Sequence, residues 1–185
     1  VAGSRSRIAL RRLAGWTSSS SPLPDVLRLY LDIDGVFHNS AFGTESVKIC
    51  RDGKPLGWFS NWFEWTPLLA EALEPFPVEI YVLSTWRYHW EEADSQDLRD
   101  FLGPLGPKYI RCIPRHIVGE PRCRLAELDM AEDGYTGPFL FLDDEEAGYE
   151  DTSNLVKLDS KFGVSDPLKL KELVSRIQEK LGLAP

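Results

Sequence analysis

The chain has 185 residues and a formal net charge of −8, and its 43% hydrophobic and 27% charged residues are typical of one globular domain rather than of a disordered chain. No apolar run approaches the roughly 20 residues that a membrane-spanning helix needs, so we expect no membrane partner. Cys50, Cys112 and Cys123 are odd in number and lack metal-ligand or CxxC spacing, which argues against a disulfide framework or a zinc site and favours a cytoplasmic location.

Residues 1–24 differ in charge from the rest of the chain. They contain four arginines and no acidic residue, whereas the remaining chain holds 17 basic and 29 acidic side chains, a net charge of −12. We therefore expect a flexible basic arm over 1–24 and a folded domain over 25–185. The arm superficially resembles an organellar targeting peptide, but we favour a disordered extension. The acidic domain predicts no strong nonspecific nucleic-acid binding, which depends on Lys and Arg at phosphates.

The first predicted strand covers residues 27–33, a short run of alternating aliphatic residues that Gly35 stops. In an open α/β sheet the carboxyl ends of the strands open into the ligand crevice, so Asp32 and Asp34 are expected to emerge there side by side. Two acids in this position can supply a nucleophile and a proton-transfer group. The alternative interpretation is a polar turn after a strand.

Residues 39–64 separate this strand from the next predicted helix. Their glycines and proline predict a hairpin-like flap, and the aromatic run over 58–65 predicts a wedge packed on the sheet. The alternative role of the aromatic run is a stacking surface for a base or a sugar. Only about 50 residues separate Asp34 from Ser84, and a helix must fit among them, so a small flap is expected and a large cap domain is not.

The second buried strand, residues 78–83, ends in the sequence Ser84-Thr85-Trp86-Arg87. Hydroxyl side chains at a strand end also cap the helix that follows, so Ser84 is informative only through its place after the two aspartates. Two roles are open for Arg87. Its guanidinium binds a substrate phosphate through two N–H groups, or it is an exposed arginine at the start of a helix.

A third buried strand with a polar end covers residues 138–142 and runs into four consecutive acids at 143–146. Like charges this close raise each other's pKa unless a cation lies among them. Magnesium, which prefers carboxylates and water, is such a cation. A solvated acidic loop is the alternative. Before this strand, Arg115, Arg122 and Arg124 lie near the start of a predicted helix.

The remaining predicted elements complete an alternation of strands and helices. In chain order they are a helix over 66–73 with Thr66 as N-cap, a helix over 95–102, a strand over 108–113, a strand over 154–158, and a helix over 166–181 capped by Asp166. None of these elements carries a candidate catalytic residue.

The sequence Asp32-Ile-Asp-Gly-Val36 resembles motif I of the haloacid dehalogenase (HAD) superfamily, and Ser84 and Asp143-Asp144 resemble its motifs II and IV in the required order. This resemblance implies a three-layer, Rossmannoid α/β fold with a parallel sheet, helices on both faces, a small flap after the first strand and no large cap. Within the superfamily, the compact form of these motifs resembles the small HAD domains of Swiss Army Knife RNA repair proteins.

The resemblance also implies a catalytic role for several residues. Asp32 would be the nucleophile that accepts a phosphoryl group, and Asp34 would be the general acid and base. Ser84 would form a hydrogen bond to the transferring group. The motif III cation, which offsets the charge of the aspartates, would be Arg124 or Arg122, with Arg124 as the first choice.

Metal and substrate contacts follow from the same resemblance. The residues that would hold Mg²⁺ are Asp32, Asp34 through its backbone carbonyl, Asp143 and Asp144. The residues that would contact the substrate are Thr85, Trp86 and Arg87.

We therefore expect a magnesium-dependent phosphohydrolase that cleaves a phosphomonoester through an aspartyl-phosphate intermediate. Its partner would be a phosphorylated small molecule or a nucleotide or nucleic-acid end. Two alternatives stay open: a non-catalytic HAD-like binding module that uses the Trp-rich flap, and a phosphotransferase. A pair of desolvated aspartates argues against the binding module, because a scaffold has no need of them.

Overall fold

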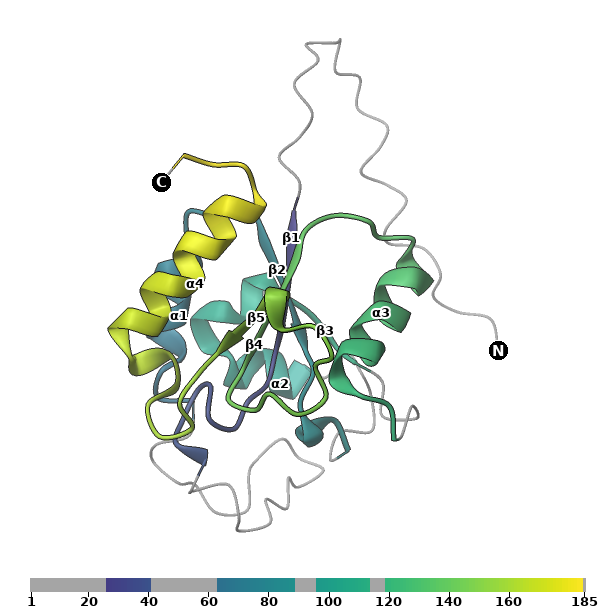
Figure 1. Cartoon of the computed structure of the whole chain (residues 1–185). Helices are drawn as coiled ribbons and strands as arrows, with labels where there is room; N and C mark the ends of the chain where they lie inside the picture. Colours follow the sequence, from purple (N-terminus) through teal and green to yellow (C-terminus); the bar gives the residue numbers. More distant parts are fainter. Residues whose placement is uncertain (1–25, 41–62, 89–95, 114–118, 185) are drawn as a thin grey trace.

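The structure, a computed structural model, describes residues 26–40, 63–88, 96–113 and 119–184, without the side chains of 87–88 and 96–97 (Figure 1). The predicted basic arm lies outside these residues, so the division of the chain at residue 24 stays a prediction. None of the described helices is both long enough and apolar enough to cross a bilayer.

Strands and helices alternate along the described chain. The strands are β1 (Leu27–Leu31), β2 (Val78–Val82), β3 (Tyr109–Cys112), β4 (Phe139–Asp143) and β5 (Leu155–Lys157). The α-helices are α1 (Thr66–Leu73), α2 (Gln96–Phe101), α3 (Arg122–Asp133) and α4 (Pro167–Lys180), and short 3-10 helices are η3 (Thr85–Tyr88), η4 (Gly103–Lys108), η5 (Thr152–Asn154) and η6 (Gly163–Ser165). Each predicted strand is present, with ends that differ by one or two residues.

The five strands form one parallel sheet in the order β3-β2-β1-β4-β5. β1 lies at its centre, where the backbone N–H of Asp32 donates to the Leu142 carbonyl at 3.1 Å and that of Leu83 donates to the Leu31 carbonyl at 2.8 Å. These bonds keep β2, β1 and β4 in register up to their last residues. The carboxyl ends of the three strands therefore meet at one edge of the sheet.

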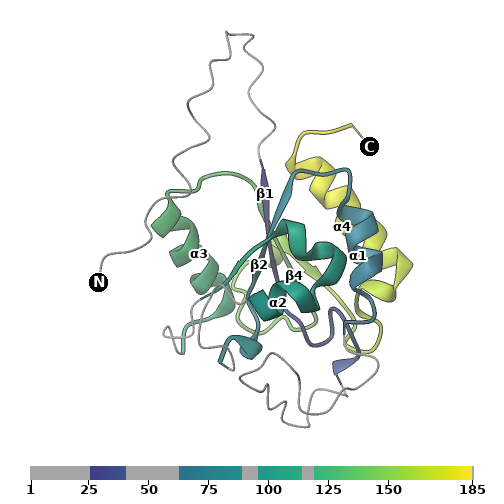
Figure 2. The same ribbon diagram turned by 180° about the vertical axis from the view of Figure 1, so that it is seen from behind.

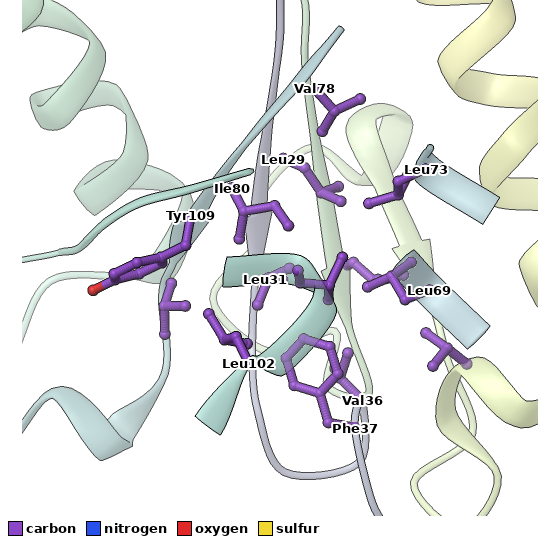
Figure 3. Packing of buried hydrophobic residues seen from close by; sticks show 14 of the residues in the cluster. Leu29, Leu31, Val36, Phe37, Leu69, Leu73, Val78, Ile80, Leu102 and Tyr109 are labelled. Atoms are coloured by element: carbon purple, nitrogen blue, oxygen red, sulfur yellow. The ribbon is translucent and has the colours of Figure 1, made fainter. Parts of the chain in front are cut away.

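Side chains along β1 alternate between the two faces of the sheet. Leu29 and Leu31 pack in one apolar cluster with Leu69 of α1 (Figure 3), and this cluster also contains residues of α2 and α4. Tyr30 belongs to the opposite cluster, where it lies with Leu125 of α3. Figures 1 and 2 show α1 and α4 together on one flank of the sheet and α3 on the other. The predicted three-layer α/β fold is confirmed, and the described residues contain no large cap.

A buried ion-pair network attaches α3 to the sheet. Arg28 on β1 pairs with Asp129 on α3 at 3.3 Å, Tyr30 donates to the same carboxylate at 2.7 Å, and Arg111 on β3 donates to it at 2.9 Å. Buried charges are costly unless they are paired and hydrogen-bonded, so this network specifies where α3 lies on the sheet. It thereby also places Arg122, the first residue of α3.

The start of α1 differs from its prediction. Thr66 was predicted as the N-cap, but the N-cap is Trp65, and Thr66 is already helical. The reason is that the Thr66 hydroxyl donates backwards to the Phe63 carbonyl at 2.8 Å instead of accepting from a helical N–H. For α4 the predicted cap is confirmed, since Asp166 accepts from the backbone N–H of Leu168 at 2.9 Å.

Two residues of the predicted aromatic segment lie within the described chain. Phe63 is buried, with its ring 5.7 Å from that of Phe37, and Trp65 packs against the same apolar cluster. These two residues form part of the core, as the wedge interpretation requires. The flap itself, over 41–62, lies outside the described residues.

Candidate active site

Three of the predicted site residues meet where β1, β2 and β4 end. Asp32 follows β1, Ser84 follows β2, and Asp143 is the last residue of β4; Asp32 is 4% exposed and the other two are fully buried. Asp32 accepts hydrogen bonds from the Ser84 hydroxyl and, at 2.7 Å through Oδ1, from the backbone N–H of Ile33. The sheet register thus brings together residues that are far apart in the sequence.

Arg122 reaches into this group from the first turn of α3. Its Nη1 lies 2.8 Å from Asp32 Oδ2 and also contacts Asp143 Oδ2, while Nη2 lies 3.4 Å from Glu145. Arg124, the first choice in the sequence, instead pairs with Glu127 at 2.8 Å on the surface. The two side chains are 15% and 53% exposed. Residues two apart on an α-helix differ by about 200° around its axis, which explains why only one of them faces the aspartates.

Burial raises the pKa values of two carboxylates of the site. Burial, with a smaller contribution from the neighbouring Asp143, raises the pKa of Asp32 to about 7 against the opposing effect of Arg122. Burial alone would lower the pKa of Arg122, but the carboxylates of Asp32 and Asp143 raise it well above its usual range. Burial and Asp143 likewise raise the pKa of Asp144 to about 6. Asp32 and Asp144 therefore ionise less readily than exposed aspartates, even with Arg122 beside them.

The acidic cluster is suited to a metal ion. Asp32, Asp143 and Asp144 each offer a carboxylate oxygen, and these oxygens all lie within 4.8 Å of one another. Oxygen ligands of this kind suit a hard cation such as Mg²⁺, whose charge would also favour the ionised forms of these buried carboxylates. The donor set of this chain thus fits the metal that the resemblance implies.

Gly35 leaves space for the side chain of Asp144. It has a φ of +67°, and a Cβ at this position would lie 2.2 Å from Asp144 Oδ2. Glycine is needed here both for the left-handed backbone and for the close approach of the Asp144 side chain. The Gly that follows the two aspartates in the sequence is therefore part of the site.

Asp34 lies beside this group with its side chain 28% exposed. Its Oδ1 is 3.1 Å from His38 Nε2, and its Oδ2 accepts a hydrogen bond of 2.8 Å from the indole Nε1 of Trp86. Trp86, which the sequence placed among the substrate contacts, is only 6% exposed. Thr85 is exposed, and the structure does not describe the side chain of Arg87.

Sequence reasoning missed two side chains of this site. The Tyr149 hydroxyl donates to Asp143 Oδ2 at 2.6 Å, and His38 contacts Asp34. Nothing in the sequence around Tyr149 distinguishes it from a core aromatic. For His38 the signal was its place, four residues after Asp34, in the turn that Gly35 begins.

Comparison with protein-family models gives a match over most of the chain. Residues 28–168 match a family model described as the HAD domain in Swiss Army Knife RNA repair proteins. The matched span runs from β1 into α4 and contains every side chain of the site described above. A search of curated proteins found no match to the chain.

Proposed function

The chain belongs to the family of HAD domains in Swiss Army Knife RNA repair proteins, and from this premise we propose that it is a magnesium-dependent phosphohydrolase of phosphomonoesters. Membership supports HAD-type phosphohydrolase chemistry at the level of the superfamily. The observation that carries the finer proposal is the environment of the Asp32 carboxylate. This buried carboxylate lies at a strand end, contacts Arg122 at 2.8 Å, and shares an acidic cluster with Asp143 and Asp144.

The proposed reaction has two steps. In the first, a carboxylate oxygen of Asp32 attacks phosphorus in line, the bond to the leaving oxygen breaks, and Asp34 gives that oxygen a proton. In the second, Asp34 takes a proton from water, the water oxygen attacks phosphorus, and the aspartyl-phosphate is cleaved to free phosphate and Asp32. Arg122 and Ser84, which both contact Asp32, are the donors available to the phosphoryl oxygens.

The metal would be held by the carboxylates of Asp32 and of Asp143 or Asp144, together with the backbone carbonyl of Asp34. When bound, Mg²⁺ would neutralise charge so that an anionic nucleophile can approach an anionic phosphate. The raised pKa values of Asp32 and Asp144 support this assignment, because a bound cation would favour their ionised forms.

A phosphorylated small molecule and a nucleotide or nucleic-acid end are the candidate substrates. The family description supports the nucleic-acid end, since it refers to RNA repair proteins. The lack of a large cap in the described residues also suits a substrate that extends beyond the site. Transfer to an acceptor other than water would use the same first step.

Phosphate release from a substrate panel tests the proposed function. The panel comprises a generic aryl phosphate, nucleotides, and RNA with a 3′- or a 5′-phosphate end, each with Mg²⁺ and with a chelator. We expect release that requires Mg²⁺, with the preferred member identifying the substrate class. Absence of release from every member would overturn the proposal and would favour the binding module.

Replacement of Arg122 by Ala is expected to lower kcat/KM on the order of 100-fold, because Asp32 and Asp143 lose their shared cation and the phosphoryl group loses a donor. Arg124→Ala removes the same side chain two residues away, from an exposed pair with Glu127, and we expect a change within about twofold.

Steady-state kinetics of both variants at saturating Mg²⁺ provide the measurement, with melting temperatures as the control for folding. Arg122→Lys keeps the charge and serves if the Ala variant unfolds. An equal loss in the two Ala variants, or a loss in Arg124→Ala alone, would show that Arg122 does not hold the motif III role.

A further inference from the structure

Two aromatic rings hold the carboxylate of Asp34 from different sides. The indole N–H of Trp86 donates to Oδ2 at 2.8 Å, and Nε2 of His38 lies 3.1 Å from Oδ1. Both oxygens of Asp34 thus have a ring nitrogen as a neighbour. The two rings come from separate parts of the chain, one from η3 after β2 and the other from the turn after β1.

The two rings are themselves held by packing. His38 is fully buried, and its ring centre lies 6.0 Å from that of Trp86. Phe63 packs edge-on against Trp86 at 5.8 Å and against His38 at 5.9 Å, and it stacks on Phe101 at 5.8 Å. Side chains packed in this way keep one rotamer, so the positions of their nitrogens are determined before any substrate arrives.

The backbone of Trp86 is also tied to the active site. Its N–H lies 3.2 Å from the hydroxyl oxygen of Ser84, which in turn donates to Asp32. Trp86 therefore joins the end of β2 to the end of β1 through both its backbone and its side chain. A shift of Trp86 would move Asp34 relative to Asp32.

An aspartate side chain rotates about only two bonds, and contacts at both oxygens leave its carboxylate plane little freedom. Hydrogen bonds from an N–H to a carboxylate are stronger than those between neutral groups, and apolar surroundings such as the Phe63 ring keep water from competing for them. Since Asp34 remains 28% exposed, its carboxylate is both oriented by the rings and accessible to a substrate.

We propose that Trp86, together with His38, is a positioning residue that orients Asp34 for proton transfer to the leaving oxygen. This inference rests on the proposed phosphohydrolase function and deepens it. It assigns Trp86 a role within the site instead of a substrate contact. Proton transfer depends steeply on the distance and angle between donor and acceptor, so a carboxylate that rotates freely would be a poorer acid.

The substitution Trp86→Phe tests the inference, because it removes the N–H donor and keeps an aromatic ring against Phe63. A leaving group with a high pKa, such as an alkoxide, depends on proton donation, whereas p-nitrophenolate leaves without it. For an alkyl phosphate we expect kcat/KM to fall on the order of tenfold or more, and for p-nitrophenyl phosphate by about twofold at most. KM is expected to stay close to its wild-type value for both substrates.

Three further variants sharpen the test. Trp65→Phe makes the same exchange of rings against the same apolar cluster, and we expect equal, small effects on both substrates. His38→Leu removes the ring nitrogen at the other oxygen and is expected to repeat the selective loss, which keeps the test valid if Trp86→Phe does not fold. In Asp34→Asn, addition of Trp86→Phe should cost nothing more, because the two changes act through one carboxylate.

The outcomes separate the inference from the proposed function. A wild-type protein that releases no phosphate from these two substrates or from any member of the panel overturns the proposed function, and the inference falls with it. An active wild type combined with equal losses on both substrates, or with no loss, in Trp86→Phe would overturn the inference alone. If the losses of activity caused by Asp34→Asn and by Trp86→Phe add up in the double variant, the inference is also overturned.

Discussion

Asp32→Asn is expected to lower phosphate release on the order of 10⁴-fold or more, because an amide is not a nucleophile toward phosphorus. Asn has the shape of Asp, and Arg122 keeps its contacts with Asp143 and Glu145, so the fold is expected to persist. The measurement is phosphate release at saturating Mg²⁺ from the preferred substrate of the panel. Full activity in this variant would exclude the aspartyl-phosphate mechanism.

The stability of this variant gives an independent readout through its pH dependence. Burial raises the pKa of Asp32 from 3.8 to about 7, so ionisation of Asp32 destabilises the metal-free protein. This destabilisation is complete above pH 7 and becomes smaller as the pH falls toward 4. A neutral Asn carries no such cost. Without Mg²⁺, Asp32→Asn is therefore expected to melt at the wild-type temperature or above it at pH 8, with the difference narrowing as the pH falls.

Glu146→Gln is a matched control for the change from acid to amide. Glu146 follows the acidic cluster in the sequence but is exposed and pairs only weakly with Lys157, at 3.2 Å. We expect its phosphate release and its melting temperature to stay close to those of the wild type. A large loss of activity here would mean that general electrostatics, and not the Asp32 nucleophile, determine the rate.

Replacement of both Asp143 and Asp144 by Asn is expected to raise the Mg²⁺ concentration at half-maximal activity on the order of 100-fold or more, because two of the three carboxylates of the cluster become neutral. The titration is best done at pH 8. There the pKa values of about 7 for Asp32 and about 6 for Asp144 leave both groups ionised in the wild type. Melting temperature against Mg²⁺ concentration provides a readout that does not require turnover.

A control for this double variant is Glu146→Gln combined with Glu150→Gln. It removes two negative charges from the same loop, but both side chains are exposed and lie outside the acidic cluster of Asp32, Asp143 and Asp144. Its Mg²⁺ midpoint should shift by about threefold at most, as expected for screened surface charges. Asp144→Asn alone serves if the double variant does not fold, since Asp143 also accepts the Tyr149 hydroxyl. An unchanged midpoint in both Asp variants would argue against a metal role for these residues.

Much of the fold was predictable because its signals are local. Five short apolar runs, the first four separated by helical segments and the last two by an acidic loop, indicated the strands, and each is present within one or two residues. The positions of Asp32, Ser84 and Asp143 at strand ends followed from the same runs, because all parallel strands end at one edge. The acidic run after β4 likewise indicated a cation site from its charge alone.

Pairing between side chains was not predictable in the same way. Arg122 and Arg124 are identical in type and both begin α3, and only the rotation of that helix on the sheet makes Arg122 face Asp32. That rotation depends on distant contacts such as the one between Arg28 and Asp129. The sequence placed both arginines near the site but did not reveal how α3 is rotated about its axis.

The contacts of Asp34 likewise separate what the sequence predicts from what only the tertiary structure shows. By itself the sequence determined that an acid follows β1 and that a tryptophan follows β2, because the order of residues and the length of each strand suffice for that. Tertiary structure alone decided that the indole of Trp86 turns back to Asp34, that His38 lies against the other oxygen, and that Tyr149 reaches Asp143. Periodicity and charge act over a few residues, whereas these contacts depend on the packing of aromatic rings from separate elements, which no local pattern encodes.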